Sequence, residues 1–366
     1  MKKIKAIAFG ILCGVLAGLV VWAFIKLMSL SMFFFWEWLP NKVNIYLLRI
    51  AICAVGGALI GLFRKKLGDY PDEMTAVMAK VKTEKFYDYK KLPIIFFGAL
   101  MPIVIGSSVG PEAGLVGIIV ALCYLVRDGV GLNKIKVHKA FRIFIYVLTT
   151  ITALGVLVGL NKLSGHGMEG FPHAKASAFS LKDALMSIVY IVAGILLGLF
   201  YEVSHSGCHI ISNKIPAILK ETIAGVVLGL FGCMLPMLMF SGEEELGVLF
   251  SSYSMYAPLL LIALAFLKVV LTNICIQFGL KGGHFFPLIF AAACLGYGIA
   301  MLSFPDSVGH VTFAAAMVCG STLGVTLKKP IAITLILCLC FPIMYIPGIF
   351  LASFLATFLA NKINSK

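Results

Sequence analysis

The sequence predicts an all-α integral membrane protein. Of its 366 residues, 61% are hydrophobic and 13% are charged, and the mean hydropathy is +1.03. These values lie far outside the range of soluble globular chains. Because no polar or proline-rich linker interrupts the chain, residues 1–366 are expected to form a single transmembrane domain.

Apolar windows long enough to cross a membrane recur along the chain, and each crossing of about 30 Å of hydrocarbon needs about 18 apolar residues. The region 1–44 has the basic start of a signal peptide, but its apolar run is too long for one, so a retained membrane helix is expected there. Several windows have room for two short helices. The windows are Ile4–Leu30, Tyr46–Phe63, Phe141–Leu160, Ala184–Phe200, Thr222–Phe240, Ala257–Phe278, Phe285–Phe304 and Ile331–Ala360.

The positive charge is concentrated between the apolar windows. The net charge is +14, and basic residues cluster at Lys2–Lys5, Arg64–Lys66, Lys80–Lys91, Lys134–Arg142 and Lys328–Lys329. By the positive-inside rule these loops and both termini are expected to face the cytoplasm, in a cell inner (plasma) membrane. A nucleic-acid partner is not expected, because membrane topology accounts for the charge.

No metal site or cofactor is predicted. The ten cysteines are scattered through apolar windows without a CxxC pair, which is typical of buried thiols. His166, Glu169 and His173 have spacing that would suit a metal on a helix, but Pro172 and the neighbouring glycines disfavour a helix there.

Two similar loops lie almost half a chain apart. GSSVGPEAGLVGIIVA begins at Gly106, and LKGGHFFPLIFAAACLG, with Gly282, lies about 176 residues later. Each is a glycine-bearing loop followed by proline and an apolar helix. The first N–H groups of such a helix have no internal partner and can bind an anion, and glycine lets the backbone approach it. Close helix packing is an alternative explanation of the glycines.

Taken together, these residues resemble the CLC family of chloride channels and proton-coupled chloride transporters. GHFFP (Gly283–Pro287) is similar to the family's GxFxP motif, GSSVGPEAG to GREGP and GDYPDE (Gly68–Glu73) to GSGIPE. GSTLGVTLKKPIAITLIL (Gly320–Leu337) resembles a later helix pair of the family. The resemblance implies two inverted helical repeats, at about 45–200 and 220–362, with broken half-helices at the midplane. It also implies a homodimer, and no cytosolic regulatory domain is expected after Lys366.

The resemblance further implies two anion sites held by backbone N–H groups. The central anion would bind at His284 and Phe285. The outer anion would lie near Phe286 and the N–H groups of Ser108, Val109 and Gly110. Tyr345, in FPIMYIPGIF, would supply a hydroxyl that faces the anion.

Two positions depart from the family pattern. The serine of GSGIPE is replaced by Gly68, so its hydroxyl is missing. The gating glutamate that precedes Gly–Pro is replaced by Val109, which cannot carry a proton. Glu112 follows Pro111 and has two possible roles: its charge can stabilise the N-terminus of the helix that begins there, or it can take part in the function. We expect that it would need a shift of register to reach the gating position. Lys162 lies where exchangers often have an inner glutamate.

The predicted function is movement of a small inorganic anion, chloride, across the bilayer, passive or weakly coupled. A proton-coupled antiporter that uses Glu112 and a fluoride-selective transporter are the alternatives within transport. A membrane-embedded enzyme with His284 or the His166 group in catalysis is disfavoured, because the sequence shows no nucleophile–base arrangement. A partner or scaffold without flux is the remaining alternative.

Overall fold

The computed structural model describes residues 2–40, 45–129, 138–164, 172–176, 181–304 and 310–364. These residues are helical almost throughout and form no β-strand; they contain one isolated backbone bridge, between Gly110 and Gly283. The prediction of an all-helical protein is therefore confirmed.

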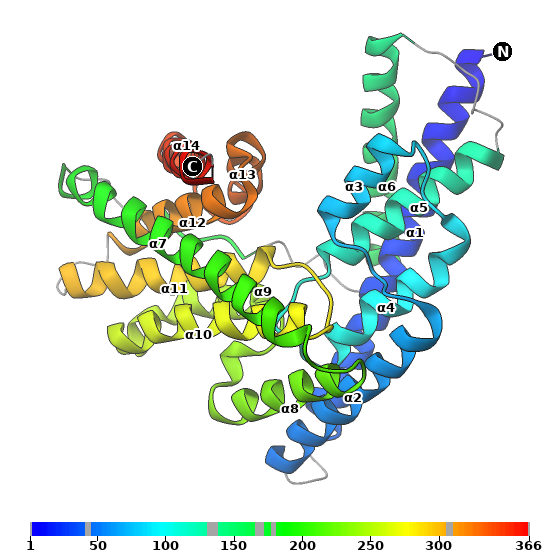
Figure 1. Ribbon diagram of the computed structural model, residues 1–366. Coiled ribbons are helices and arrows are strands. Elements are labelled where there is room, and N and C mark those ends of the chain that lie inside the picture. The colour runs from blue at the N-terminus through cyan, green and yellow to red at the C-terminus, as the bar shows by residue number, and fades with distance from the viewer. Residues whose placement is uncertain are drawn as a thin grey trace.

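The first half of the chain forms one group of helices, drawn in blue to green-cyan in Figure 1. Its long segments are α1 and α6, whereas α4 and α5 are shorter, are joined by the first glycine loop and pack side by side. The segments are α1 (Lys2–Met32), η1 (Phe33–Trp38), α2 (Ile45–Leu67), α3 (Met74–Thr83), η2 (Tyr89–Lys91), α4 (Leu92–Val104), α5 (Glu112–Gly129) and α6 (Lys139–Leu163).

The second half forms the other group, drawn in green to red in Figure 1. Here α10 and α11 meet at the second glycine loop. The segments are α7 (Leu181–Ser212), α8 (Leu219–Met234), η4 (Pro236–Leu238), α9 (Glu243–Ser252), η5 (Tyr253–Met255), α10 (Pro258–Gln277), α11 (Phe285–Ser303), α12 (Val311–Leu327), α13 (Pro330–Leu337), η6 (Ile343–Tyr345) and α14 (Ile346–Asn364).

The two groups repeat the same packing pattern. Helix α1 lies along α6 as α7 lies along α12, α4 packs on α5 as α10 packs on α11, and α3 contacts α5 as α9 contacts α11. The helices from α1 to α6 thus share these pairings with the helices from α7 to α12.

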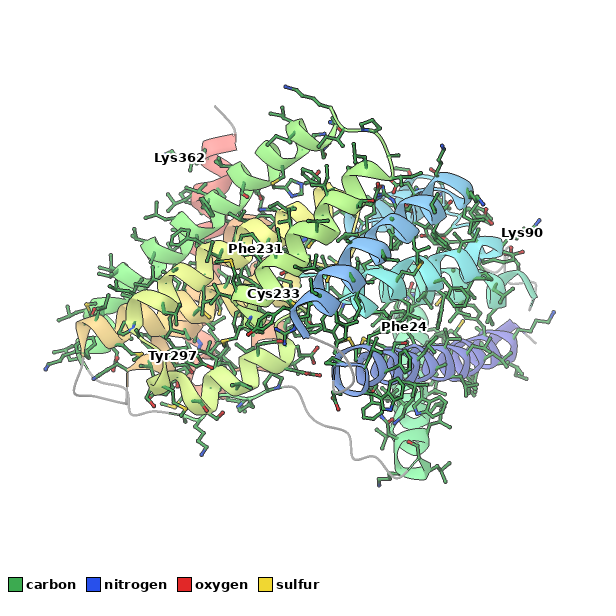
Figure 2. The ribbon with its side chains drawn as sticks, turned by 90° about the horizontal axis from the view of Figure 1, so that it is seen from below. Phe24, Lys90, Phe231, Cys233, Tyr297 and Lys362 are labelled. Carbon is green, nitrogen blue, oxygen red and sulfur yellow. The ribbon has the colours of Figure 1, made fainter. Side chains whose placement is uncertain are left out.

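The two groups are joined through α2 and α8, which pack along each other. Glycines allow this close approach: a Cβ on Gly229 would lie 2.7 Å from the Cα of Ile50. In Figure 2, Phe231 and Cys233 mark α8 in the second group, and Phe24 marks α1 in the first.

Seven helical segments in the described part of the chain are long and apolar enough to cross a membrane. The window Thr222–Phe240 is not among them, because α8 ends at Met234 before the proline of η4. The window Ile331–Ala360 divides into α13 and α14, as its length allowed, with Pro342 in the break. The spanning segments are Lys3–Trp38, Tyr46–Leu67, Ile143–Leu163, Leu181–Ser212, Pro258–Gln277, Phe285–Ser303 and Ile343–Ile363.

Candidate anion-binding site

The two glycine loops predicted from the sequence lie against each other. The N–H of Gly110 donates to the carbonyl of Gly283, and the N–H of Gly283 donates to the carbonyl of Gly110, each at 2.7 Å. A Cβ on Gly110 would lie 2.7 Å from the Cδ of Glu112, and a Cβ on Gly283 would collide with the same carboxylate. Only glycine at both positions leaves room for this carboxylate between the loops.

The carboxylate of Glu112 lies where α5 and α11 begin. Its Oε1 accepts a hydrogen bond from the N–H of Phe285 at 2.8 Å, and the backbone of Phe286 also hydrogen-bonds the carboxylate. Its Oε2 is buried and has no hydrogen-bond partner. Both helix N-termini carry partial positive charge, so they stabilise a negative group at this point.

The prediction for Glu112 concerned the family's gating position; the structure places its carboxylate at the start of α11. Its side chain reaches the N–H of Phe285 from its own place after Pro111. The physical reason is the pairing of Gly110 with Gly283, which brings the start of α11 within one side-chain length of the start of α5.

The N–H groups expected to hold the outer anion already have partners. The N–H of Val109 donates to the carbonyl of Ser107 at 2.7 Å, and that of Gly110 is used in the bridge between the loops. The backbone of Ser108 hydrogen-bonds the thiol of Cys275. An anion at these three residues would have to replace contacts within the protein, whereas the N–H of Phe285 already binds a carboxyl oxygen.

The serine hydroxyls of the first loop differ in their surroundings. The Oγ of Ser108 lies 2.9 Å from the Oγ1 of Thr272 on α10, and both are buried. The Oγ of Ser107 is buried without a hydrogen-bond partner. Ser107 therefore retains a hydroxyl that can donate to a ligand.

Gly68 lies just after α2 with a φ of +104°, a backbone conformation that favours glycine. The next residue, Asp69, forms an ion pair of 2.8 Å with Lys281, which precedes Gly282 in the second loop. Gly68 is thus tied to the second loop through its neighbour.

The structure does not bring Tyr345 to the loops. The ring of Tyr345 lies 5.6 Å from that of Phe313, in the first turn of α12. Just before that turn, the ring of His310 contacts Phe304, which follows the last turn of α11. Tyr345 therefore lies near the C-terminal end of α11, a helix about 28 Å long, whereas the loops meet at its N-terminal end.

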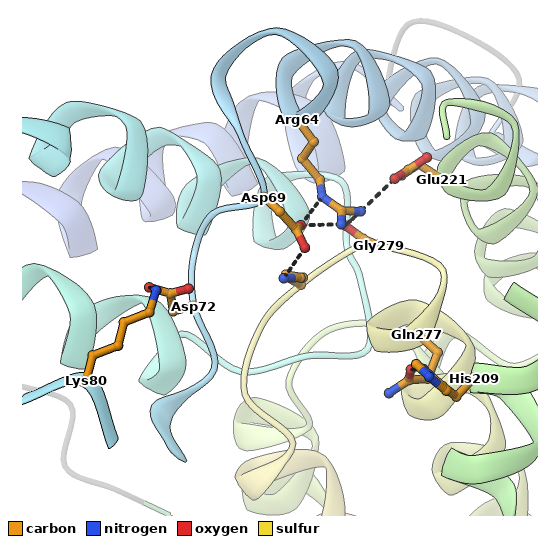
Figure 3. Close-up of polar contacts among 9 residues, drawn as sticks. Arg64, Asp69, Asp72, Lys80, His209, Glu221, Gln277 and Gly279 are labelled. Atoms are coloured by element: carbon orange, nitrogen blue, oxygen red, sulfur yellow. Dashed lines mark hydrogen bonds and ion pairs between the residues drawn. The ribbon is translucent and has the colours of Figure 1, made fainter. Parts of the chain in front are cut away.

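An ion-pair network that the sequence did not reveal ties the halves together; it is buried at Glu221 and exposed at Asp69 (Figure 3). Arg64 pairs with Asp69 and donates from Nη1 to Glu221 at 2.6 Å and to the carbonyl of Gly279 at 3.1 Å. Burial raises the pKa of Asp69, but the hydrogen bonds and charges of Lys281 and Arg64 outweigh it and hold the pKa of this carboxyl below its usual value. Residues of this network lie up to 215 positions apart in the sequence. Contacts over such a distance leave no local sequence pattern from which they could be predicted.

Lys268 is the second group that sequence reasoning missed. It is fully buried in α10, and its Nζ donates to the carbonyls of Leu238, Met239 and Phe240 at 2.8–3.0 Å. The N–H of Phe240 in turn donates to the carbonyl of Gly106 at 2.9 Å. Lys268 thus holds the segment before α9 against the first loop; a lone lysine in an apolar window was the available sequence signal.

Of the three residues considered for a metal site, the structure describes His173. His166 and Glu169 lie outside the described residues, and the ring of His173 contacts the carbonyl of Leu339 at 3.1 Å. Across the described ranges, no group of three or more His, Cys, Asp or Glu residues could hold a metal ion.

Comparison with known proteins gives the fold and the family. The family model for "Voltage gated chloride channel" matches residues 130–361, more than half of the chain. The chain therefore belongs to the CLC family of voltage gated chloride channels, and it is a multi-pass membrane protein. A comparison with curated proteins found no match.

Three solved structures have a similar fold at low sequence identity. A slow cyanobacterial Cl⁻/H⁺ antiporter has a TM-score of 0.74 at 16% identity, and covers 100% of this chain and 95% of that one. A CLC-type fluoride/proton antiporter has a TM-score of 0.69 at 18% identity, covering 98% and 95%. A eukaryotic CLC transporter has a TM-score of 0.72 at 15% identity, covering 98% of this chain and 72% of that one.

Proposed function

We propose that this protein moves a small inorganic anion, chloride, across the membrane past the N-terminus of α11. One observation carries the proposal: the N–H of Phe285 holds a buried carboxylate oxygen at 2.8 Å. A backbone donor at a helix N-terminus that stabilises this oxygen also stabilises a halide in its place. The anion and Glu112 would therefore compete for the same donor.

Passive or weakly coupled flux is the first candidate mode. Val109 is fully buried and has no titratable atom, so the family's gating position cannot carry a proton here. Val109→Glu should slow anion flux, since it would add a negative side chain between the loops.

Proton-coupled exchange is the second candidate mode, and the position of Glu112 favours it. A deprotonated Glu112 holds the donor that the anion needs, and a protonated one competes less strongly. Glu243, at the start of α9, is half-buried and interacts electrostatically with Glu112, which offers a second carboxylate near the first. Antiporters of chloride and of fluoride with protons are among the solved structures with this fold.

The test is flux from vesicles that contain the purified protein. Chloride or fluoride efflux and proton movement would be recorded together, with and without a proton gradient. Anion efflux with few protons supports the first mode, whereas uphill proton movement that Glu112→Gln abolishes supports the second. Glu244→Gln is the matched control, because Glu244 is exposed in the first turn of α9. Absence of flux for either anion would contradict the proposal and favour a scaffold role.

We also propose that both termini face the cytoplasm and that two copies associate. The position of one basic segment supports the orientation: Lys85, in the segment Lys80–Lys91, lies at the C-terminal end of α5, where Arg127 donates from Nη1 to its carbonyl at 3.2 Å. Labelling of single cysteines introduced near Lys3 and Lys362 from each side of the membrane checks the orientation. Cross-linking in the membrane checks the dimer.

A further inference from the structure

An ion pair with one exposed end lies directly before the second loop. The Nζ of Lys281 donates to the Oδ2 of Asp69 at 2.8 Å, whereas the Oδ1 of the same carboxylate accepts from Arg64. The side chain of Asp69 is 60% exposed and that of Lys281 is 21% exposed. An ion from solution can therefore reach the pair at the point where the second loop meets solvent.

The ammonium group of Lys281 has donors to spare. It carries three N–H donors, and its hydrogen-bond partner among the described residues is the carboxylate of Asp69. Lys268 differs, because its ammonium group donates to three backbone carbonyls in a fully buried place. A small anion can bind the remaining donors of Lys281 without breaking a bond of the backbone.

The second loop leads from Lys281 to the backbone donor of the proposed anion site. Lys281 lies four residues before Phe285, so their Cα atoms are no more than about 14 Å apart. Gly282, His284 and Phe285 are partly exposed, whereas the facing residues 108–110 of the first loop are buried. The second loop is therefore the side of the site that is open to ions, and Lys281 lies at its outer end.

Positive charge around the pair favours an anion there. Lys65 and Lys66 follow Arg64 in the last turn of α2 and are exposed. Lys220 lies in the first turn of α8, next to Glu221, which binds Arg64. The two carboxylates of the network balance its two cations, so these three lysines add an excess of positive charge. Such an excess raises the local concentration of anions and their rate of association.

We propose that Lys281 is the first binding site of the anion on its way to the start of α11, and that Asp69 competes with the anion for this lysine. The proposal rests on the proposed function. An arriving chloride ion replaces the Oδ2 of Asp69 on the ammonium group. The carboxylate keeps its contact with Arg64, beside which it lies in Figure 3, so the exchange leaves no charge without a partner. The chloride ion then moves along the loop to the N–H of Phe285.

The test breaks the same ion pair from each end and measures how chloride exchange saturates. Exchange of labelled chloride is followed in vesicles with equal chloride on both sides, so the orientation of the protein does not matter, and a large organic anion keeps the ionic strength constant. Lys281→Gln removes the first site, so the half-saturating chloride concentration should rise. Asp69→Asn removes the competitor, so this concentration should fall. Because exposed ion pairs contribute little free energy, each shift should be about twofold to fivefold.

Opposite shifts distinguish an anion site from a structural tie, because a tie that only holds the loop would respond alike to the loss of either partner. Lys80→Gln and Asp72→Asn are the matched controls. They break another ion pair of 2.8 Å, which Figure 3 shows apart from Asp69, and should leave the half-saturating concentration unchanged. Lys281→Arg keeps the charge and should also leave it unchanged.

Shifts of Lys281→Gln and Asp69→Asn in the same direction overturn the inference and leave the proposed function standing. Thermal unfolding shows whether each variant keeps its fold. If Lys281→Gln does not fold, Asp69→Asn decides the matter: a lower half-saturating concentration supports the inference, and an unchanged or higher one overturns it. No chloride exchange by the unmodified protein overturns both the inference and the proposed function.

Discussion

Replacing Glu112 with glutamine should strengthen anion binding. The carboxylate accepts a hydrogen bond from Phe285 at 2.8 Å in a buried place. Hydrogen bonds to a charged group contribute about 1.5–3 kcal/mol and those between neutral groups about 0.5–1.5 kcal/mol. The glutamine oxygen keeps the contact but loses the charge, so the competitor is weakened by about 1–1.5 kcal/mol, and the apparent Kd for chloride should fall about fivefold to tenfold.

Isothermal titration of the purified protein with chloride, against a background of a large organic anion, measures this change. Glu244→Gln removes a charge from the start of α9, where the side chain is exposed, and should leave the Kd unchanged. Thermal unfolding of each variant shows whether the fold is kept. An unchanged or weaker affinity in Glu112→Gln, with the fold intact, would refute the idea that this carboxylate and the anion compete for one donor.

Three further predictions follow from the same contacts. Gly283→Ala should weaken anion binding far more than Phe285→Leu does, because the added Cβ would fill the space between the loops that the Glu112 carboxylate now occupies and that the anion would need. The backbone N–H of Phe285 survives a change of its side chain. Titration with chloride checks both variants. Arg64→Met should lower the free energy of unfolding by about 3–5 kcal/mol, because it leaves the buried carboxylate of Glu221 without its partner; unfolding in detergent measures this. Asp69→Asn should reduce the loss of stability in acid. Ion pairs lower the folded pKa of this carboxyl, so its contribution to the free energy of unfolding is full above about pH 4 and is lost as pH falls through the folded pKa. The pH dependence of unfolding measures this effect.

Each of these predictions has a control or a contradicting result. Equal, small effects of the two loop variants would count against the paired-glycine geometry. Lys80→Met breaks the half-exposed pair with Asp72 and should cost no more than about 1 kcal/mol; a similar cost for Arg64→Met would show that its network is not buried in solution. The same acid loss with and without Asp69 would show that its ion pairs do not form.

Much of the fold could be predicted because its causes are local. The apolar windows led to helices such as α1, α2, α10 and α11, since hydrocarbon requires long apolar runs with internally bonded backbones. The glycine loops before Glu112 and Phe285 were also found from the sequence, because the turns that need glycine are local properties. The proline of the second motif, Pro287, lies in the first turn of α11 and not before it.

The helix ends inside long windows were less predictable. Thr222–Phe240 was expected to span the membrane, but α8 stops at Met234. Lys268 lies in the window Ala257–Phe278, which averaged hydropathy treats as apolar, and Glu221 directly precedes the window Thr222–Phe240. The partners of both residues belong to other segments of the chain. An average over 18 residues cannot show where a buried charge finds its partner.

The sequence by itself determined the class of protein, the CLC resemblance and the two loops that meet at Gly110 and Gly283. Only the tertiary structure decided that Glu112 reaches Phe285, that Tyr345 lies at the far end of α11 and that Lys281 pairs with Asp69. The physical reason is the range of the causes. Hydropathy, turn chemistry and helix N-termini act within a few residues, whereas a hydrogen bond between residues 173 or 212 positions apart exists only after helix packing has fixed both backbones.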